Sequence, residues 1–583
     1  MKIRERRYFK AYLFILIGLI FTNNGLNAQD KHYPADYFRP PLGIPLYLSG
    51  TFGELRSNHF HSGMDIKTGG VEGKNVYAIA DGYVSRIKVS VGGYGKAIYI
   101  THPNGYVSVY GHLKKYNEEI QSFVTSYQYE RESFEVEIFP DKDQLKVMKG
   151  EVIAISGNTG SSAGPHLHFE IREEVTQQPV NPLLFKSLKI KDYTRPKINE
   201  IAIYPVDESS RINGKHDTVI YTVGGWGEEH YLLNQPQIKV SGSIAFGIGT
   251  HDLMNEIPNK NGVYSIEMWV DTTQVFGLKM DQLSFSTTRY INSLIDYSYY
   301  QKKKRRLVRT EVDTNNLLDV YQHVTSNGIV DFNDSLEHNV VFKVNDAYDN
   351  KAKLVFRVLS ESDEETIQEG LSRVYPGNYF DMAKVNKLSD GNISLSFPAH
   401  AFYRSFYFNL TVDSSEKSFS PVYKVHNRFT PVHKAFNIQI KPDSVADGLE
   451  DKMYLAYSNG NGGYGFLSAK WEDGRLTAMS RSFGDYFIMV DTVSPEIIPV
   501  NIGKGKDISG QRSIQVKIRD QETGIKKYRG TINGQWIIME YDAKKQMLTY
   551  NYDNRLLKGE NTFKLQIEDM LGNEEAYEVI LYY

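Results

Sequence analysis

Short runs of β-type residues, separated by glycines and polar turns, fill almost the whole chain after residue 30. Residues 76–80, 82–87 and 97–100 are examples, and almost no segment has the apolar spacing of a long amphipathic helix. Tyrosine and phenylalanine are abundant, with 41 and 29 residues, and aromatic side chains favour half-buried strands over helices. We therefore expect a mainly β fold.

The clearest local prediction is a hairpin in the glycine-rich first third of the chain. Pro103, Asn104 and Gly105 separate the run 97–101 from a second β-type run, 106–110. An Asn-Gly pair suits the tight turn of a β-hairpin, because both residues tolerate positive φ. The sequence thus predicts two antiparallel strands here.

A chain of 583 residues should contain several domains, because single cores stop growing at about 250–300 residues. Residues 338–346, followed by Asn350, resemble residues 560–569, followed by Asn573. In both segments, alternating apolar residues lead into an Asp-x-x-x-Asn turn. This weak repeat indicates two Ig-like β-sandwich modules that end in the same hairpin, and an unrelated set of antiparallel sheets is the alternative.

These patterns divide the chain into five parts. We expect a signal peptide at 1–28, a small antiparallel-β domain at 29–190, a β-sandwich of possible Ig-like type at 191–360, a β-rich domain at 361–490 and an Ig-like β-sandwich at 491–583.

The N-terminus has the three parts of a secretory signal peptide. Basic residues between Lys2 and Lys10 precede an apolar run, 11–21, and a polar stretch ends at Ala28, where cleavage is expected. The apolar run has about half of the roughly 20 residues that cross a bilayer, so a permanent membrane anchor is the less favoured alternative. We predict export to the periplasm or cell envelope of a bacterium, with no membrane insertion after cleavage.

Two global counts narrow the class of protein. The chain has no cysteine, and therefore no disulfides and no cysteine for a bacterial lipid anchor, which suits a bacterial envelope protein better than a eukaryotic secreted one. The formal net charge of -3 gives no reason to expect a nucleic-acid partner. The basic run 302–306 could contact an anionic polymer, although a solvated strand or turn is the simpler interpretation.

Two motifs far apart in the sequence have the composition of a metal site. His61 and Asp65 flank Ser-Gly-Met, and His166 and His168 flank a leucine. Without cysteine, a zinc site must use imidazole and carboxylate ligands, and a catalytic site takes three protein ligands and leaves the fourth position to water. The two motifs supply such a set, although the sequence alone treats His166 and His168 alike.

Alternation along a strand sorts the residues near these motifs into two faces. In the run 166–171, the two histidines and Glu170 share one face, which leaves the apolar residues between them for a core. By the same rule Tyr110 and His112 should share a face, and Gly111 should let another segment or a ligand come close. Two further histidines, His59 and His102, have the simpler interpretation of surface or loop residues.

Together these motifs resemble the lysostaphin/LytM-type zinc endopeptidases, which cut cross-links of bacterial peptidoglycan. The resemblance covers about residues 45–186 and includes the segments 61–65, 110–113, 157–160 and 164–170 in the same order. It implies that His61, Asp65 and His168 bind Zn²⁺. It also implies that His112 and His166 are catalytic groups beside the metal.

One segment, about 116–149, is an insertion relative to this family pattern and is rich in glutamate and aspartate. Because it follows the strand of His112, we expect its ends near the metal and the segment itself as a wall or lid over the cleft. Its acidic residues would favour a substrate that carries free amino groups.

The sequence therefore predicts an exported zinc metalloendopeptidase that hydrolyses peptide cross-links of peptidoglycan. Metal-activated water would be the nucleophile, and His112 and His166 would move protons and stabilise the oxyanion, in roles that the sequence does not divide between them. The first alternative is a non-catalytic envelope protein that binds cell wall or activates an amidase, and the second is an adhesion or glycan-binding protein. The downstream modules could bind envelope partners, and a chain ended near residue 190 should keep the chemistry.

Overall fold

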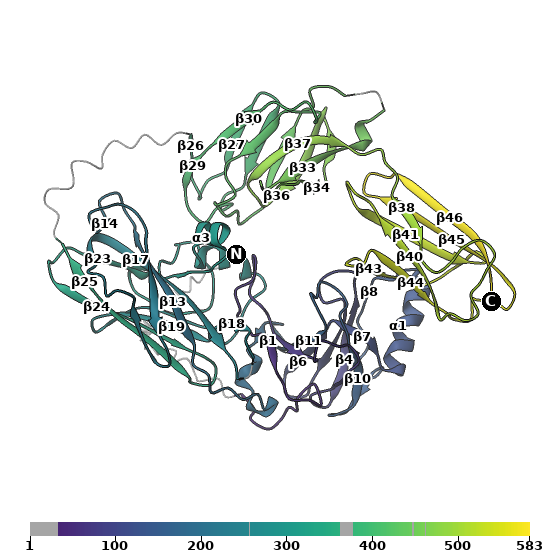
Figure 1. Ribbon diagram of the computed structural model, residues 1–583, viewed down its shortest axis with the longest axis horizontal. Helices are drawn as coiled ribbons and strands as arrows, with labels where there is room; N and C mark the ends of the chain where they lie inside the picture. The colour runs from purple at the N-terminus through teal and green to yellow at the C-terminus, as the bar shows by residue number, and fades with distance from the viewer. Residues whose placement is uncertain (1–32, 256, 362–376, 446–447, 461) are drawn as a thin grey trace, which may run out of the picture.

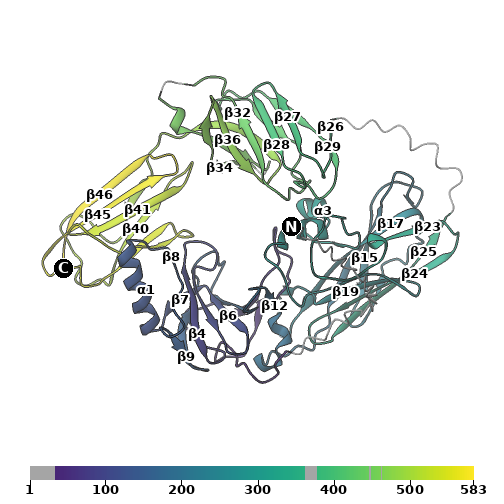
Figure 2. The same ribbon diagram turned by 180° about the vertical axis from the view of Figure 1, so that it is seen from behind.

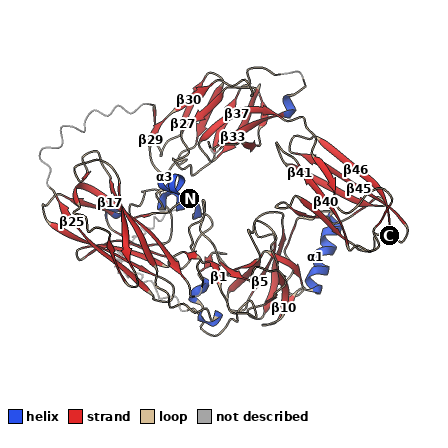
Figure 3. Cartoon of the chain, in the orientation of Figure 1, coloured by secondary structure: helices blue, strands red, loops and turns tan. Residues whose placement is uncertain are grey.

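The computed structural model describes residues 33–583 except 256, 362–376, 446–447 and 461. The signal peptide expected at 1–28 lies outside the described residues. Strands account for 47% of the structure and helices for 8%, which confirms the mainly β prediction (Figure 3). Among the described residues, no helix has the length and apolar character needed to cross a bilayer.

The N-terminal region is built on a nine-stranded antiparallel sheet. Its main order is β1-β2-β11-β6-β5-β4-β8, with β12 paired to β11 and β9 paired to β4. The strands are β1 Leu48–Gly50, β2 Met64–Lys67, β4 Gly82–Val89, β5 Lys96–Thr101, β6 Tyr106–Gly111, β8 Val136–Ile138, β9 Lys146–Val147, β11 His166–Glu173 and β12 Pro179–Val180. The predicted hairpin is confirmed as β5 and β6, with Gly105 in the turn at φ 81°.

A smaller sheet contributes to the same hydrophobic core. Its order is β3-β10-β7, with β3 Asn75–Tyr77, β10 Val152–Ser156 and β7 Leu113–Tyr116. Ile153 of this sheet and Phe169 of the large sheet are fully buried in one cluster. The core therefore fixes the back of β11, whose other face carries the histidines.

The segment 116–149 does not form the expected lid. It consists of helix α1 Glu118–Arg131, followed by β8 and β9 at the β4 edge of the large sheet, opposite β1 and β2. The reason is its apolar content, because Ile120, Val124 and Val136 are buried in the core and hold the segment at that edge.

The next region is a thirteen-stranded arrangement with its own core. Its main order is β14-β17-β13-β15-β16-β25-β24-β19-β20-β22, and β18, β21 and β23 pair with β17. The strands are β13 Lys197–Pro205, β14 Arg211–Ile212, β15 Val219–Gly225, β16 Glu229–Leu232, β17 Lys239–Leu253, β18 Lys260–Asn261, β19 Ser265–Val270, β20 Thr273–Lys279, β21 Val308–Arg309, β22 Tyr321–Val324, β23 Ile329–Phe332, β24 Glu337–Asn345 and β25 Lys351–Ser360. Two short helices, α2 Ile291–Leu294 and α3 Tyr297–Lys303, interrupt it. Phe52 and Phe60 of the N-terminal region are buried in this core, so both regions contribute side chains to it.

Two further pairs of sheets complete the chain. In the third region, sheets β27-β28-β32-β36-β35 and β30-β31-β37-β33-β34 enclose one core, with β26 and β29 paired separately. These strands are β26 Asn378–Phe380, β27 Asn386–Asp390, β28 Ile393–Phe397, β29 Phe406–Phe408, β30 Leu410–Asp413, β31 Val422–Val425, β32 Phe436–Ile440, β33 Met453–Ser458, β34 Gly465–Leu467, β35 Lys470–Glu472, β36 Arg475–Ser480 and β37 Gly484–Val490.

The C-terminal region is a two-sheet structure with the orders β38-β40-β44-β43 and β39-β46-β45-β41-β42. Its strands are β38 Glu496–Pro499, β39 Lys506–Asp507, β40 Ser513–Arg519, β41 Ile525–Ile532, β42 Gln535–Trp536, β43 Glu540–Asp542, β44 Met547–Asn551, β45 Glu560–Asp569 and β46 Glu574–Tyr582. Both segments of the sequence repeat form the expected hairpins, β24 with β25 and β45 with β46.

The C-terminal region returns to the N-terminal region, so that the chain closes into a ring (Figures 1 and 2). Tyr129 of α1 donates a hydrogen bond to Asp553, and the guanidinium of Arg555 lies 3.5 Å from the centre of the Tyr129 ring. Lys544, in the turn between β43 and β44, donates a hydrogen bond of 3.2 Å to the carbonyl of Ser162. The insertion thus serves as a contact surface for the last region.

Candidate metal centre

Adjacent strands bring the two sequence motifs together. In the pairing of β2 with β11, His168 lies directly opposite Asp65, and such cross-strand neighbours share a face of the sheet. His61 lies just before β2 and completes the group. All three residues are buried, and they are one of the groups of described side chains that could hold a metal ion.

The distances in this group fit a tetrahedral metal. His61 Nε2 lies 3.1 Å from Asp65 Oδ1 and 3.2 Å from His168 Nδ1, and His168 Nδ1 lies 3.0 Å from Asp65 Oδ1. Ligand atoms bound to one zinc ion at its usual bond lengths are roughly 3.3 Å apart. Two imidazoles and one carboxylate, without a thiolate, are a zinc donor set that leaves a position open.

Hydrogen bonds fix which nitrogen of each histidine faces the other ligands. His61 Nδ1 donates to the carbonyl of Thr51 at 2.8 Å, so its Nε2 lone pair is free for a metal. His168 is turned the other way, because its Nε2 donates to Glu170 Oε1 at 2.8 Å and leaves Nδ1 free. Such partners hold the rings in a ligating orientation.

Asp65 is held as a carboxylate with one oxygen directed at the histidines. Arg56 Nη2 lies 3.1 Å from Asp65 Oδ2, which leaves Oδ1 as the oxygen nearest the imidazoles. Burial opposes the charge of Asp65, but its interactions with His166, His168 and His61 hold its pKa well below the usual value. The carboxylate is therefore ionised, as a ligand must be.

Glu170 is the most buried charge of the centre, with no exposed surface. Ser62 Oγ and Arg172 Nε each donate to it at 2.6 Å, and the hydroxyl of Tyr94 donates as well. Burial alone would raise its pKa, but the charge of Arg172 and the bond from His168 hold the pKa well below its usual value. Glu170 thus presents a permanent negative charge to His168.

His112 and His166 lie next to this group but outside it. Their rings are 4.7 Å apart, and the His112 ring is 5.9 Å from that of His168. His166 Nε2 is 3.4 Å from Asp65 Oδ1, a longer distance than those within the group. The structure therefore brings all five predicted residues together.

Both of these histidines expose the same nitrogen to the site. His112 Nδ1 donates to the carbonyl of Thr159 and His166 Nδ1 to that of Gly164, each at 2.8 Å. Burial, followed by the electrostatic influence of His168 and His166, lowers the pKa of His112 to about 3. His112 is therefore neutral near pH 7, with a lone pair on Nε2.

The prediction that Tyr110 and His112 share a face is wrong. Tyr110 is fully buried in the core with Phe169, its cross-strand neighbour. His112 has left-handed backbone, φ 58°, so the alternation of the strand ends at Gly111 and the imidazole turns into the site. Gly111 itself faces His168, and a Cβ there would lie 3.4 Å from the Cβ atoms of His168 and Tyr94.

The apolar row of β11 is where the sequence predicts it. The three residues that alternate with the histidines and Glu170 have no exposed surface. The same period of two continues to Arg172, so it could have identified this partner of Glu170 as well. Thr51, Arg56 and Tyr94 lie in loops, where no periodic pattern marks them.

A family model described as peptidase family M23 matches residues 59–129 and 132–182, which contain all five predicted residues. The chain is 36% identical over 166 residues to an uncharacterised metalloprotease of Haemophilus influenzae, over 27% of this chain and 29% of that protein. It is 35% identical over 129 residues to the DD-carboxypeptidase/endopeptidase Mpg of Neisseria meningitidis, over 22% of this chain and 23% of that protein. With the lipoprotein NlpD of Yersinia enterocolitica it shares 32% identity over 116 residues, which are 20% of this chain and 93% of that protein.

The chain belongs to peptidase family M23. The resemblance found in the sequence is thereby confirmed, and membership in M23 agrees with zinc as the metal. The chain spans less than a third of the length of the Haemophilus and Neisseria relatives. The N-terminal region, which contains this match, is called the M23 region below. A second family model, described as a Zu5-like domain, matches residues 377–491, outside it.

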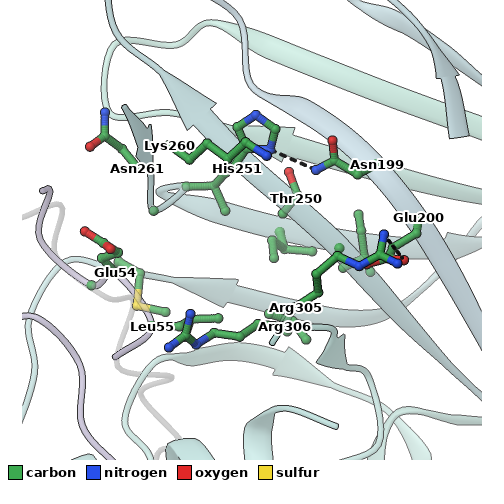
Figure 4. Close-up of a pocket in the computed structure, with 18 of the residues that line it drawn as sticks. Glu54, Leu55, Asn199, Glu200, Thr250, His251, Lys260, Asn261, Arg305 and Arg306 are labelled. Atoms are coloured by element: carbon green, nitrogen blue, oxygen red, sulfur yellow. Dashed lines mark hydrogen bonds and ion pairs between the residues drawn. The ribbon is translucent and has the colours of Figure 1, made fainter. Parts of the chain in front are cut away.

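A cavity of about 360 Å³ lies between the M23 region and the region that follows it. Glu54, Leu55, Arg305 and Arg306 are among the residues that line it (Figure 4). The basic run 302–306 is therefore not wholly solvated, since Arg305 Nη1 pairs with Glu200 Oε2 at 3.2 Å. None of the five predicted residues lines this cavity.

Proposed function

We propose that this protein is a zinc-dependent endopeptidase that hydrolyses peptide cross-links of peptidoglycan in the bacterial cell envelope. The observation that carries the proposal is the convergence of His61 Nε2, Asp65 Oδ1 and His168 Nδ1 within 3.2 Å of one another. The name of the relative Mpg, a DD-carboxypeptidase/endopeptidase, supports the substrate class. The prefix DD refers to a peptide bond between two amino acids of D configuration, and such bonds are a feature of peptidoglycan peptides.

The proposed ligands are His61, Asp65 and His168. Zinc bound there would lower the pKa of water towards about 7 and polarise the scissile carbonyl. The chain supports this chemistry by holding Asp65 through Arg56 and His168 through Glu170, so that no ligand has to reorient.

His112 and His166 are the proposed proton-transfer groups. Each keeps its Nδ1 proton in a bond to a backbone carbonyl, so Nε2 is the atom that can take a proton from the nucleophile and return it to the leaving amine. The other histidine can donate to the tetrahedral oxyanion when its Nε2 also carries a proton. The geometry leaves open which histidine does which.

Digestion of purified sacculi tests the proposal. The zinc-loaded protein should release peptide-linked fragments that mass spectrometry identifies as the products of cross-link cleavage, and a chelator should stop the release. Protein that holds one zinc per chain but releases no fragment would favour the alternative, a non-catalytic protein that binds cell wall or activates an amidase.

Export is a separate part of the proposal and rests on residues 1–28. Protein recovered from the envelope fraction of its host should begin at or near residue 29. An intact N-terminus on cytoplasmic protein would contradict export without affecting the proposed chemistry.

A further inference from the structure

Three buried carboxylates meet where the M23 region joins the region that follows it. Asp192 lies in the connection between the two regions, Asp252 lies near the end of β17, and Asp346 follows β24. They are 4%, 4% and 3% exposed, and one carboxylate oxygen of each lies within 4.8 Å of those of the other two. None of the three belongs to the metal centre described above.

Two of these carboxylates have an oxygen without any hydrogen-bond partner. Asp192 Oδ2 and Asp252 Oδ1 are buried and receive no donor, and no ion pair from a described lysine or arginine reaches the group. Burial, followed by the charges of Asp192 and Asp346, raises the pKa of Asp252 to about 9. Burying carboxylate oxygens without a compensating partner is costly, so this arrangement calls for a positive charge among them.

The C-terminal region contains the same arrangement and serves as an internal comparison. Its group consists of Asp491, Asp520 and Asp569. Asn350 Nδ2 donates to the carbonyl of Asp192 at 3.2 Å, and Asn573 Nδ2 donates to that of Asp491 at 3.1 Å.

The aspartates after β24 and in β45 also match. Asp346 Oδ1 accepts the N–H groups two and four residues later, and its Oδ2 accepts Asn350 Nδ2 at 2.6 Å. Asp569 accepts the same three bonds, with Asn573 Nδ2 at 2.7 Å. The two groups therefore share these contacts and differ in what reaches the remaining oxygens. Asp252 is also buried, whereas Asp520 is half-buried.

That difference decides which group needs a cation. In the C-terminal group, Thr523 Oγ1 donates to Asp491 Oδ2 at 2.9 Å, and Asp520 Oδ1 accepts the N–H groups of Thr523 and Gly524 at 2.7 and 2.6 Å. The chain supplies protons to these oxygens. In the first group, Asp192 Oδ2 and Asp252 Oδ1 have no donor.

We propose that Asp192, Asp252 and Asp346 bind a divalent cation, and that this cation is Ca²⁺. Oxygen-only ligands without histidine or thiolate favour hard cations, and Ca²⁺ accepts irregular sets of carboxylate and carbonyl oxygens more readily than Mg²⁺ does. A cavity of about 10 Å³ adjoins the group, close to the volume that one water-sized particle needs.

The site lies where a bound cation would fix the junction of two regions. Asn181 and Leu183 of the M23 region line the same small cavity as Asp252 and Asp346. Tyr348, two residues after Asp346, packs against the core of the M23 region. Calcium would therefore stabilise the contact between the M23 region and the region of β13 to β25, without a part in the zinc chemistry.

Calcium binding to the zinc-loaded full-length protein tests this site. Isothermal titration with CaCl₂ in calcium-free buffer should give one Ca²⁺ per chain, and calcium should raise the melting temperature. Asp252→Asn should remove both effects while zinc stays at one equivalent. Because asparagine is neutral and of similar size, this variant should melt at or above the wild-type temperature when calcium is absent.

Two matched variants serve as controls. Asp520→Asn changes one aspartate of the C-terminal group, and Asp217→Asn changes an exposed aspartate outside both groups. Both should bind one Ca²⁺, as the wild type does. Wild-type protein that binds no Ca²⁺, or an Asp252→Asn variant that binds calcium as the wild type does, would overturn the proposal.

Discussion

Glu170 is hydrogen-bonded to His168, one of the three proposed zinc ligands. It accepts the Nε2 proton of His168 and is itself held by Ser62 and Arg172. Glu170→Gln removes the negative charge that makes His168 a strong donor to the metal. Zinc affinity should fall about 10–100-fold, the usual effect of losing such a partner. Competition with a zinc chelator measures this, and the exposed Glu174→Gln is the control; equal affinities in the two variants would contradict the role given to Glu170.

His102 makes a pH-dependent contribution to stability. It lies in a turn, as the sequence suggests, but it is only 2% exposed, and burial lowers its pKa to about 4. A histidine with a depressed folded pKa stabilises the fold above the unfolded value of about 6.5 and loses that contribution as the pH falls towards 4. The resulting decrease in the free energy of unfolding should reach about 3 kcal/mol. His102→Gln should flatten the stability of the M23 region between pH 6.5 and 4, as followed by hydrogen exchange, and an unchanged slope would contradict this assignment.

At the scale of single residues, the sequence identified the clustered side chains better than their hydrogen-bond partners. His61, Asp65 and His168 belong to compact motifs, so their types and spacing indicate a metal site. Thr51 and Arg56 act through a backbone carbonyl and a loop side chain, whose positions depend on tertiary packing. No local pattern encodes such positions.

At the scale of elements, alternation succeeds along β11 and fails at the end of β6. β11 continues beyond its histidines, so the period of two correctly separates core from site. β6 ends at Gly111, and the left-handed backbone of His112 breaks the alternation. A positive φ in a residue other than glycine has no reliable sequence pattern, which explains the wrong face for Tyr110.

The insertion also shows why its position after the strand of His112 was not enough to predict a lid. Asn117 caps α1 by accepting a bond from the N–H of Ile120 at 3.0 Å, and buried apolar residues fix the helix at the sheet edge. Asn117→Ala should destabilise the helix by about 1 kcal/mol. Amides of 118–131 should exchange about five times faster, whereas the exposed Glu130→Gln should leave exchange unchanged. Peptidase activity should stay at the wild-type level in both variants; a fall specific to Asn117→Ala would restore a role of this segment at the cleft.

At the scale of the whole molecule, the M23 region is not independent of the region that follows it. Thr51, whose carbonyl orients His61, is bonded through its hydroxyl to the N–H of Gly262 at 3.0 Å. Phe52 and Phe60 are buried in the core of that following region. The M23 region alone would expose both phenylalanines. It would also lose the contacts with the following region that hold the loop of His61 in place.

A chain ended at residue 190 should therefore lose zinc affinity and activity, contrary to the expectation from the sequence that the chemistry survives. The sequence placed a boundary there because Pro179–Pro182 closes the last motif, but contacts between regions are invisible to such a pattern. Metal analysis and peptide cleavage by the truncated and full-length proteins measure the effect. A truncated chain with one zinc and full activity would show that the shared core is dispensable.

Of the five clustered side chains, three are the proposed zinc ligands and two are the proposed proton-transfer groups. Metal analysis of five purified full-length variants tests this assignment most directly. His61→Ala, Asp65→Ala and His168→Ala should lose zinc, because each removes an atom of the close group. His112→Ala and His166→Ala should keep about one zinc per chain, while their rates fall about 10²–10⁴-fold, the usual contribution of a proton-transfer group. An empty His166→Ala variant beside a zinc-loaded His168→Ala variant would contradict the account.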